Sequence, residues 1–220
     1  LYSTTDLATL VEREALFHPE QVIYVVDKRQ ELHFTQVFRV AKKAGIVSDK
    51  TKMVFLGFGT MNSKDGGPFK TRDGGVMRLE NLIADIDEEM YRKIVENRSV
   101  KDKDAKDTAK IVGLSAIKYG DLSNQASKDY VFDVDRFTSA EGNTGPYILY
   151  TIVRIKSILN KYKEAKGEPV KGIVKAAQAD CEKALMLELA KFNEAIENAY
   201  TEKAPHKICL LYTSDAADEL

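Results

Sequence analysis

The chain changes its hydrophobic pattern once along its length. Up to about residue 75, apolar stretches alternate between strand-like and helix-like spacing. This pattern predicts helices over residues 6–16 and 34–44, and strands over residues 22–27 and 52–57. Strand, helix and strand in this order form a β-α-β unit, which builds a parallel sheet through a right-handed crossover. Ligands of such sheets bind beyond the carboxyl ends of the strands, so we expect the loops after both strands to face one crevice.

From residue 79 onward the pattern is almost entirely helical. Apolar residues at three- and four-residue spacing predict helices over residues 79–97, 104–122, 146–163, 180–192 and 193–203. Thr144, Asp180 and Asn193 are residue types that favour helix N-caps, and Pro146 suits a first helical turn. One short extended stretch is predicted over residues 130–134. The predicted fold class is therefore α/β followed by all-α.

Composition excludes some partners and leaves others open. The 33 Lys and Arg residues balance 34 Asp and Glu residues, so overall charge attracts neither nucleic acid nor membrane, and a polyanion site requires a local patch. No apolar run approaches the about 18 residues that span a bilayer, and the first residues lack a signal-peptide pattern. We expect a cytoplasmic protein without a membrane partner. The two cysteines have no CxxC partner or nearby histidine pair, so no protein-bound metal is expected.

Residues 57–75 join the end of an apolar strand to a glycine-rich, basic loop. Six of the thirteen glycines fall in this stretch, beside Lys64, Lys70, Thr71 and Arg72. Glycine permits close backbone approach, and these side chains donate hydrogen bonds to phosphate oxygens, so a polyphosphate is the natural ligand. A flexible surface hairpin is the alternative, because glycine-rich loops are common and few of them bind phosphate.

Four segments in a fixed order resemble the middle of an arginyl-tRNA synthetase, a class I aminoacyl-tRNA synthetase. They are residues 1–8, 27–38, 57–62 together with 68–75, and 141–147. The resemblance implies an arginine–tRNA ligase that activates arginine with ATP as arginyl-adenylate and transfers it to tRNA(Arg) in protein synthesis. It also implies the C-terminal half of a Rossmann-type nucleotide-binding domain, followed by a truncated helical anticodon-binding domain.

Three residues have the chemistry of an arginine pocket. A guanidinium presents five donors in one plane, so a selective site needs a carboxylate, neutral acceptors and preferably an aromatic face. Tyr2, Asp6 and Gln30 supply these groups. The resemblance places them in the family's arginine pocket, with Asp6 pairing the substrate's cation and the other two orienting it. The alternative is an ordinary helical pair of Tyr2 and Asp6, four residues apart, with Gln30 as a simple loop residue.

The resemblance also assigns an ATP site. His33, expected just before the helix over residues 34–44, is a candidate nucleotide contact, and a capping or surface role is the alternative. The strand-end segment that flanks adenine in the family corresponds to Gly57, Phe58, Gly59 and Met61. Mg²⁺ is expected to arrive with ATP as part of the substrate.

Lys70, Thr71 and Arg72 occupy the place of the second class I signature, and they are the expected catalytic residues. In the family this mobile loop stabilises charge on the transferring phosphates, mainly in the transition state. The local sequence departs from the usual KMSKS signature, as in many arginyl enzymes, and leaves the role of Lys70 open. The other signature, HIGH, is absent and expected upstream. Half a parallel sheet leaves an uncovered apolar face, so we expect an internal fragment that is inactive alone.

By resemblance, the chain divides into several parts. Residues 1–78 are the catalytic half-domain, 79–148 a helical stem-contact and junction region, and 149–208 the start of the anticodon-binding domain. Residues 209–220 resemble the translation of a sequencing adapter and are expected to lie outside the native fold. The candidate tRNA contacts are Arg136, Arg154 and Lys156. For the basic residues 156–166, a solvated helix face is the alternative. The parent protein is expected to be a monomer.

Two other classes of protein account for parts of the sequence. A non-catalytic helical module that binds tRNA or other RNA explains the helical half, but it leaves the arginine pocket and the glycine-rich loop unexplained. An unrelated nucleotide-binding α/β enzyme explains the loop but not residues 141–147.

Overall fold

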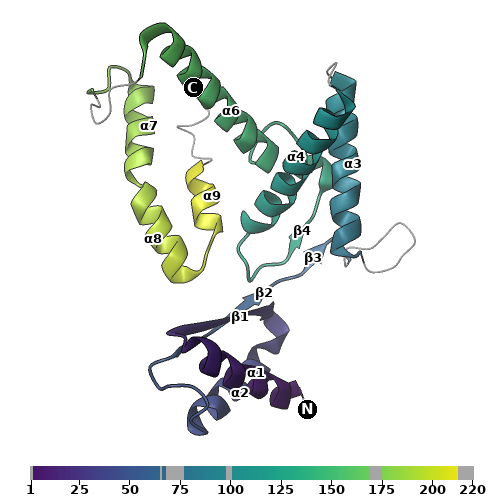
Figure 1. The fold of residues 1–220 in the computed structure, drawn as a ribbon, viewed down its shortest axis with the longest axis vertical. Coiled ribbons are helices and arrows are strands. Elements are labelled where there is room, and N and C mark those ends of the chain that lie inside the picture. Colours follow the sequence, from purple (N-terminus) through teal and green to yellow (C-terminus); the bar gives the residue numbers. More distant parts are fainter. Residues whose placement is uncertain (1, 65, 68–76, 98–100, 169–174, 213–220) are drawn as a thin grey trace. The chain divides into compact units, whose positions relative to one another are not determined.

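The computed structural model describes residues 2–64, 66–67, 77–97, 101–168 and 175–212. The chain divides into two compact units, Leu1–Met61 with Ala126–Tyr130, and Asn62–Gln125 with Val131–Leu220. The first unit is α/β and the second is mostly helical, which confirms the fold class predicted from the sequence pattern (Figure 1). Within the described ranges, no helix combines the length and the apolar character needed to cross a membrane.

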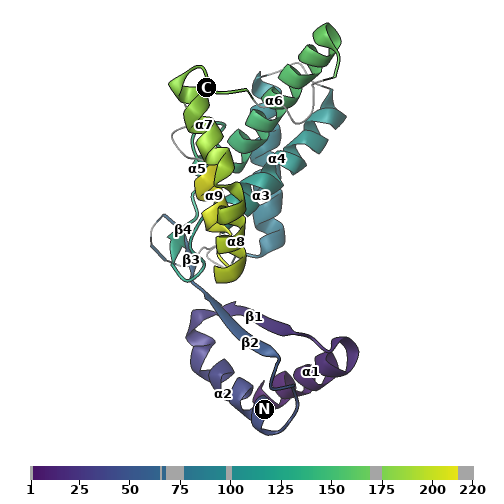
Figure 2. The same ribbon diagram turned by 90° about the vertical axis from the view of Figure 1, so that its left-hand side faces the viewer.

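The first unit contains the predicted β-α-β arrangement. Its elements are α1 (Tyr2–Phe17), β1 (Gln21–Asp27), the 3-10 helix η1 (Lys28–Gln30), α2 (Glu31–Lys43) and β2 (Lys52–Phe58). β1 and β2 pair in parallel, with Gln21 opposite Lys52 and Asp27 opposite Phe58. Both helices lie on the same face of this two-stranded sheet (Figures 1 and 2).

Alternation along β1 decides which side chains enter the core. Val22 and Tyr24 are buried, whereas Ile23 is 42% and Val25 is 60% exposed. Since successive strand residues point to opposite faces, one face of β1 packs on the helices and the other leaves apolar side chains uncovered. The core of the unit consists of Leu10, Val22, Tyr24, Phe34, Val37, Ala41 and Val47. An uncovered face is what we expected of half a parallel sheet.

Both helices of the first unit begin earlier than predicted. α1 begins at Tyr2, so Tyr2 and Asp6 lie one turn apart on the same helix. α2 begins at Glu31 and follows directly on η1, with Gln30 as its N-cap. His33 therefore lies in the first turn of α2, and its predicted place before the helix is wrong. The apolar periodicity starts only at Phe34, so it gave no sign of the polar first turn.

The second unit is built around α4. Its helices are α3 (Leu79–Asn97), α4 (Asp102–Leu122), α5 (Val134–Phe137), α6 (Gly145–Lys166), α7 (Asp180–Ala190), α8 (Phe192–Glu202) and α9 (His206–Tyr212). α3 and α6 both pack against α4, and α8 packs against α9 (Figure 2). Small residues such as Ala105, Ala109 and Ala116 are buried along α4, which allows the neighbouring helices a close approach.

A short ribbon joins distant parts of the sequence. β3 (Met61–Asn62) pairs with β4 (Tyr130–Val131). β4 confirms the start of the extended stretch predicted over residues 130–134, but the stretch ends earlier than predicted. The Asp133 carboxylate accepts hydrogen bonds from the backbone N–H groups of Asp135 and Arg136, at 3.1 and 3.4 Å, and so begins α5. β3 was not predicted, because two residues carry no periodic signal.

The predicted helix caps are confirmed only in part. Thr144 caps α6, where its hydroxyl accepts a hydrogen bond from Tyr147 N at 3.2 Å. The N-caps predicted at Asp180 and Asn193 are wrong, since Ala179 and Lys191 hold those positions. Both polar residues lie inside the first turns instead. For Asp180, an acidic side chain is favourable in the first turn as well as at the cap, so residue type alone does not fix the cap position.

Residues 209–220, which we expected to be a non-native tail, begin inside α9. Cys209 lies in α9 and is buried, and its carbonyl oxygen accepts a hydrogen bond from the Tyr119 hydroxyl at 3.4 Å. Residues 209–212 are thus part of the fold, contrary to the expectation that they lie outside it. The origin of residues 209–220 stays a prediction.

Candidate functional site

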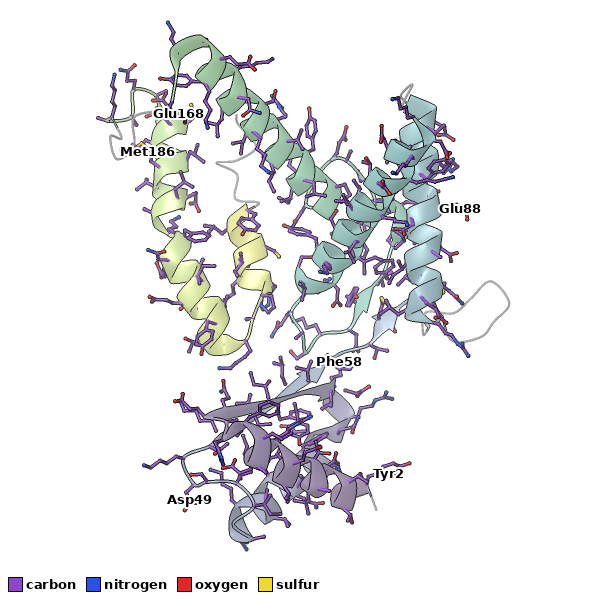
Figure 3. All side chains as sticks on the ribbon, viewed as in Figure 1. Tyr2, Asp49, Phe58, Glu88, Glu168 and Met186 are labelled. Atoms are coloured by element: carbon purple, nitrogen blue, oxygen red, sulfur yellow. The ribbon has the colours of Figure 1, made fainter. Side chains whose placement is uncertain are left out.

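The arginine and nucleotide candidates between residues 2 and 61 all lie in the first unit. β1 ends at Asp27 and β2 at Phe58, and these two residues are partners in the parallel ladder. Figure 3 labels Tyr2, at the start of α1, and Phe58, at the end of β2. The carboxyl ends of both strands therefore meet at one edge, as the β-α-β pattern predicts.

Asp6 and His33 form the closest polar contact among these candidates. The Asp6 Oδ2 atom lies 2.7 Å from His33 Nε2, and the side chains are 28% and 29% exposed. Leu10, one turn after Asp6, and Phe34, next to His33, are both core residues, so packing holds the two helices in register. Asp6 is thereby placed beside the first turn of α2. His33, its partner in that turn, follows Gln30 by three residues.

Tyr2 begins α1, and Gln30 immediately precedes α2. Tyr2 is 86% exposed. Gln30 is exposed, and its side chain makes no capping hydrogen bond to α2. Within the described part of the chain, no hydrogen bond joins either side chain to Asp6. Both side chains are accessible to a ligand, and the convergence of all three on a guanidinium stays a prediction.

Tyr24 lies in the core beneath the two helices. Its ring is 4.7 Å from that of Phe34, and the Arg13 guanidinium lies 5.3 Å from its centroid. Burial raises the pKa of Tyr24; the charge of Arg13 opposes this effect and that of Asp6 adds to it. Its buried hydroxyl has no hydrogen-bond partner among the described residues. Tyr24 is therefore neutral at physiological pH.

The cations at the end of β1 are already paired. Arg29 forms hydrogen bonds to both carboxylate oxygens of Asp27, at 2.9 and 2.6 Å, and these bonds lower the pKa of Asp27 to about 2. Lys28 donates a hydrogen bond to Asp129 at 2.8 Å, which lowers the pKa of that carboxyl group. Each cation is thus partly neutralised by a carboxylate, although Arg29 stays 81% exposed and keeps unused N–H donors.

The segment after β2 is fixed by contacts that the sequence did not reveal. The Asp129 carboxylate also accepts a hydrogen bond from Thr60 N, at 2.8 Å, and Gly59 N donates to Ala126 O at the same distance. A Cβ at Gly57 would lie 2.8 Å from Lys28 Cα, and one at Gly59 would overlap the Lys128 carbonyl oxygen. Both glycines are thus required by internal packing. Lys28 and Asp129 are 101 positions apart, so no local pattern connects them.

These contacts limit what the strand-end segment offers a nucleotide. The Gly59 N–H is occupied, whereas Phe58 is exposed and Gly57 and Met61 are partly exposed. The adenine-flanking role predicted for Gly57, Phe58, Gly59 and Met61 stays a prediction. The expected catalytic residues Lys70, Thr71 and Arg72 lie outside the described residues.

Lys64, the described lysine of the glycine-rich segment, forms ion pairs within the second unit. Its Nζ atom lies 3.0 Å from Asp133 and 3.4 Å from Asp135. Hydrogen bonds to both carboxylates raise the pKa of Lys64. This lysine therefore anchors the segment after β3 to the start of α5.

The three candidate tRNA contacts are exposed cations on the second unit. Arg136 lies on α5, and Arg154 and Lys156 lie on α6. The Arg154 guanidinium sits 5.7 Å from the centroid of the Tyr150 ring. None of the three has an ion-pair partner within the described ranges. In those same ranges, no cluster of three or more His, Cys, Asp or Glu side chains is arranged to hold a metal ion.

Two family models match the chain. Residues 1–134 match "tRNA synthetases class I (R), catalytic domain", and residues 148–217 match "DALR anticodon binding domain". The first match covers the first unit and the start of the second, and the next begins inside α6. Residues 135–147, from α5 to the first turn of α6, lie between the two matches.

Curated relatives and solved structures agree with these models. The chain is 64% identical to an arginine–tRNA ligase of Agathobacter rectalis and 56% identical to one of Alkaliphilus oremlandii, with 95% of the chain covered in each. It spans 36% and 35% of their lengths. Arginyl-tRNA synthetase structures from Plasmodium falciparum and Thermus thermophilus match at a TM-score of 0.71, with 26% and 27% identity. They cover 94% and 90% of this chain, which spans 35% and 32% of theirs.

Proposed function

Because the chain belongs to the arginyl family of class I tRNA synthetases, we propose that the whole protein is an arginine–tRNA ligase. It activates arginine with ATP and transfers the arginyl group to tRNA(Arg). The family resemblance read from the sequence is confirmed. The chain spans only about a third of its relatives, so the activity, substrates and partners of the whole protein belong to this proposal.

In the first unit, Asp6 binds the guanidinium group of arginine, and Tyr2 and Gln30 orient it. The observation that carries this assignment is the contact between Asp6 and His33, which places a partly buried carboxylate beside the end of β1 and η1. A hydrogen-bonded ion pair between a carboxylate and a guanidinium is stronger than a neutral hydrogen bond, and its geometry is more specific. Lysine lacks the planar fork of donors, so such a pocket selects arginine.

ATP, accompanied by Mg²⁺, binds at the carboxyl ends of β1 and β2. Gly57, Phe58, Gly59 and Met61 flank the nucleotide, and Lys70, Thr71 and Arg72 stabilise the transferring phosphates. This division is supported by the ion pairs of Lys28, Arg29 and Lys64, since each of these cations already has a carboxylate that offsets part of its charge. Charge stabilisation that develops only in the transition state raises the rate rather than the affinity.

The helical unit binds tRNA. Residues 79–148 join the catalytic half-domain, residues 1–78, to the anticodon-binding domain that starts at residue 149. Arg136, Arg154 and Lys156 contact phosphates, which is supported by their exposure and their lack of ion pairs in the described ranges. The protein works in the cytoplasm, where translation takes place, and as a monomer.

The test is arginine-dependent exchange of pyrophosphate into ATP, measured on the full-length protein with tRNA(Arg) present. We expect exchange with arginine but not with lysine or citrulline. Asp6→Asn removes the charge but keeps the shape, and it should lower kcat/KM for arginine by about a hundredfold, because a charge-assisted pair with the substrate's guanidinium is lost. Asp49→Asn, a change at an exposed turn residue, is the matched control and should have no effect.

Two results would contradict the proposal. If the wild-type protein binds tRNA but shows no exchange with arginine, a non-catalytic RNA-binding module explains the helical unit better. If exchange occurs and Asp6→Asn and Asp49→Asn behave alike, Asp6 is not the guanidinium ligand.

A further inference from the structure

Only one oxygen of the Asp6 carboxylate, Oδ2, has a side-chain hydrogen-bond partner among the described residues. His33 Nε2 lies 2.7 Å from Oδ2, and the two residues come from different helices, 27 positions apart. No other side-chain hydrogen bond reaches Asp6 within the described part of the chain. Its second oxygen, Oδ1, is therefore the one left for a ligand.

The imidazole ring is itself fixed by packing. It meets the ring of Phe34 edge-on, with 5.0 Å between centroids and an interplanar angle of 82°. Phe34 is buried and belongs to the core of the unit. A ring held in this way offers its Nε2 atom in one direction.

The hydrogen bond to His33 restricts rotation of the Asp6 carboxylate about its terminal torsion. The terminal torsion of an aspartate side chain is broad and nearly two-fold, so an unrestrained carboxylate presents either oxygen over a range of angles. A carboxylate only accepts hydrogen bonds, so the imidazole must donate through Nε2–H. Fixing Oδ2 before the substrate arrives lowers the ordering cost of binding and aims Oδ1 in a defined direction.

We propose that His33 is a positioning residue that orients the Asp6 carboxylate for the guanidinium group of arginine. This inference rests on the proposed function. It gives His33 a different task from the nucleotide contact expected from the sequence, because its Nε2 atom is engaged by Asp6. The two tasks differ in which substrate is affected: positioning changes the KM for arginine, and nucleotide binding changes the KM for ATP.

The experiment varies arginine and ATP separately in the pyrophosphate-exchange assay of the full-length protein. His33→Phe keeps an aromatic ring against Phe34 but removes the donor. We expect it to raise the KM for arginine by about three- to tenfold, the usual cost of ordering one side chain on binding, and to leave the KM for ATP within about twofold. His33→Gln, whose side-chain amide can replace the Nε2 donor, should recover most of the arginine affinity.

A double-mutant cycle tests whether His33 acts through Asp6. In an Asp6→Asn background, His33→Phe should add little further loss, because the carboxylate that it orients is gone. Melting curves of each variant identify any effect that comes from unfolding. His33→Gln provides the second measurement if His33→Phe does not fold.

The inference is overturned if the wild-type enzyme is active and His33→Phe leaves the KM for arginine unchanged. It is also overturned if the KM for ATP rises instead, or if the two losses simply add in the cycle. A wild-type protein without arginine-dependent exchange gives a different result, since it overturns the proposed function as well.

Discussion

At the scale of single residues, close packing and polar pairing account for the shape of the candidate site. Gly59 lies where the backbone of residue 128 passes so near that a Cβ would overlap its carbonyl oxygen. Thr60 N and Lys28 share the Asp129 carboxylate next to it. The glycine content that suggests a phosphate loop is thus explained, at the described positions nearest to β2, by contacts of the chain with itself.

Replacing Gly59 with alanine should therefore destabilise the protein. The obstructing atom belongs to the backbone and cannot rotate away, so we expect a loss of about 1–3 kcal/mol in the free energy of unfolding, the usual cost of overpacking. Gly67→Ala is the matched control, because nothing lies within 4 Å of a Cβ there. Chemical denaturation of both variants is the measurement. Equal midpoints would contradict the prediction, because they would mean that the backbone around residue 128 shifts to accept the Cβ at little cost.

At the scale of elements, the start of α6 shows how a turn sequence builds a junction. The Thr144 hydroxyl accepts from Tyr147 N and donates to Ser139 O at 2.7 Å, so one side chain satisfies both the helix end and the preceding turn. A Cβ on Gly145 would overlap the Ser115 carbonyl oxygen, so this glycine allows α6 to start directly against α4. The glycines and proline of residues 141–147 serve this junction within the second unit.

The cap at Thr144 gives a prediction for α6. Thr144→Ala removes both hydrogen bonds at a buried position, and we expect it to lower the free energy of unfolding by about 1–2 kcal/mol. Thr144→Ser keeps the hydroxyl and should retain most of the stability. Thermal melting followed by circular dichroism distinguishes the two. Similar losses in both variants would mean that the methyl group, and not the cap, stabilises this end of the helix.

At the scale of the whole molecule, the chain is a part of the enzyme proposed. It spans 36% of the Agathobacter rectalis relative, and its sequence contains no HIGH motif. The outer face of β1 leaves Ile23 and Val25 exposed, as expected where a parallel sheet lacks its second covering layer. We therefore expect the proposed active site to depend on groups outside residues 1–220.

Residues 1–220 expressed alone should neither activate arginine nor charge tRNA. The full-length protein, assayed under the same conditions, is the positive control for pyrophosphate exchange. Turnover by the shorter protein, at a rate that scales with its concentration and is lost in Asp6→Asn, would contradict this prediction.

The local hydrophobic pattern predicted most of the helices and strands, but few of the residues at which they begin. Periodicity shows which residues face the core, so the β-α-β unit and the long helices α3, α4 and α6 were predicted nearly as they are. The beginnings of α1 and α2 and the N-caps at Ala179 and Lys191 were missed. Polar first turns carry no apolar period, and several residue types suit both a cap and the turn that follows it.

The sequence by itself determined the family, the class of fold and the supply of chemical groups, because local side-chain order records burial and motif spacing. Only the tertiary structure decided which of those groups meet. His33 contacts Asp6 across 27 positions, and Lys28 contacts Asp129 across 101. Such polar pairs depend on how separate elements pack, and that packing leaves no periodic trace in the chain.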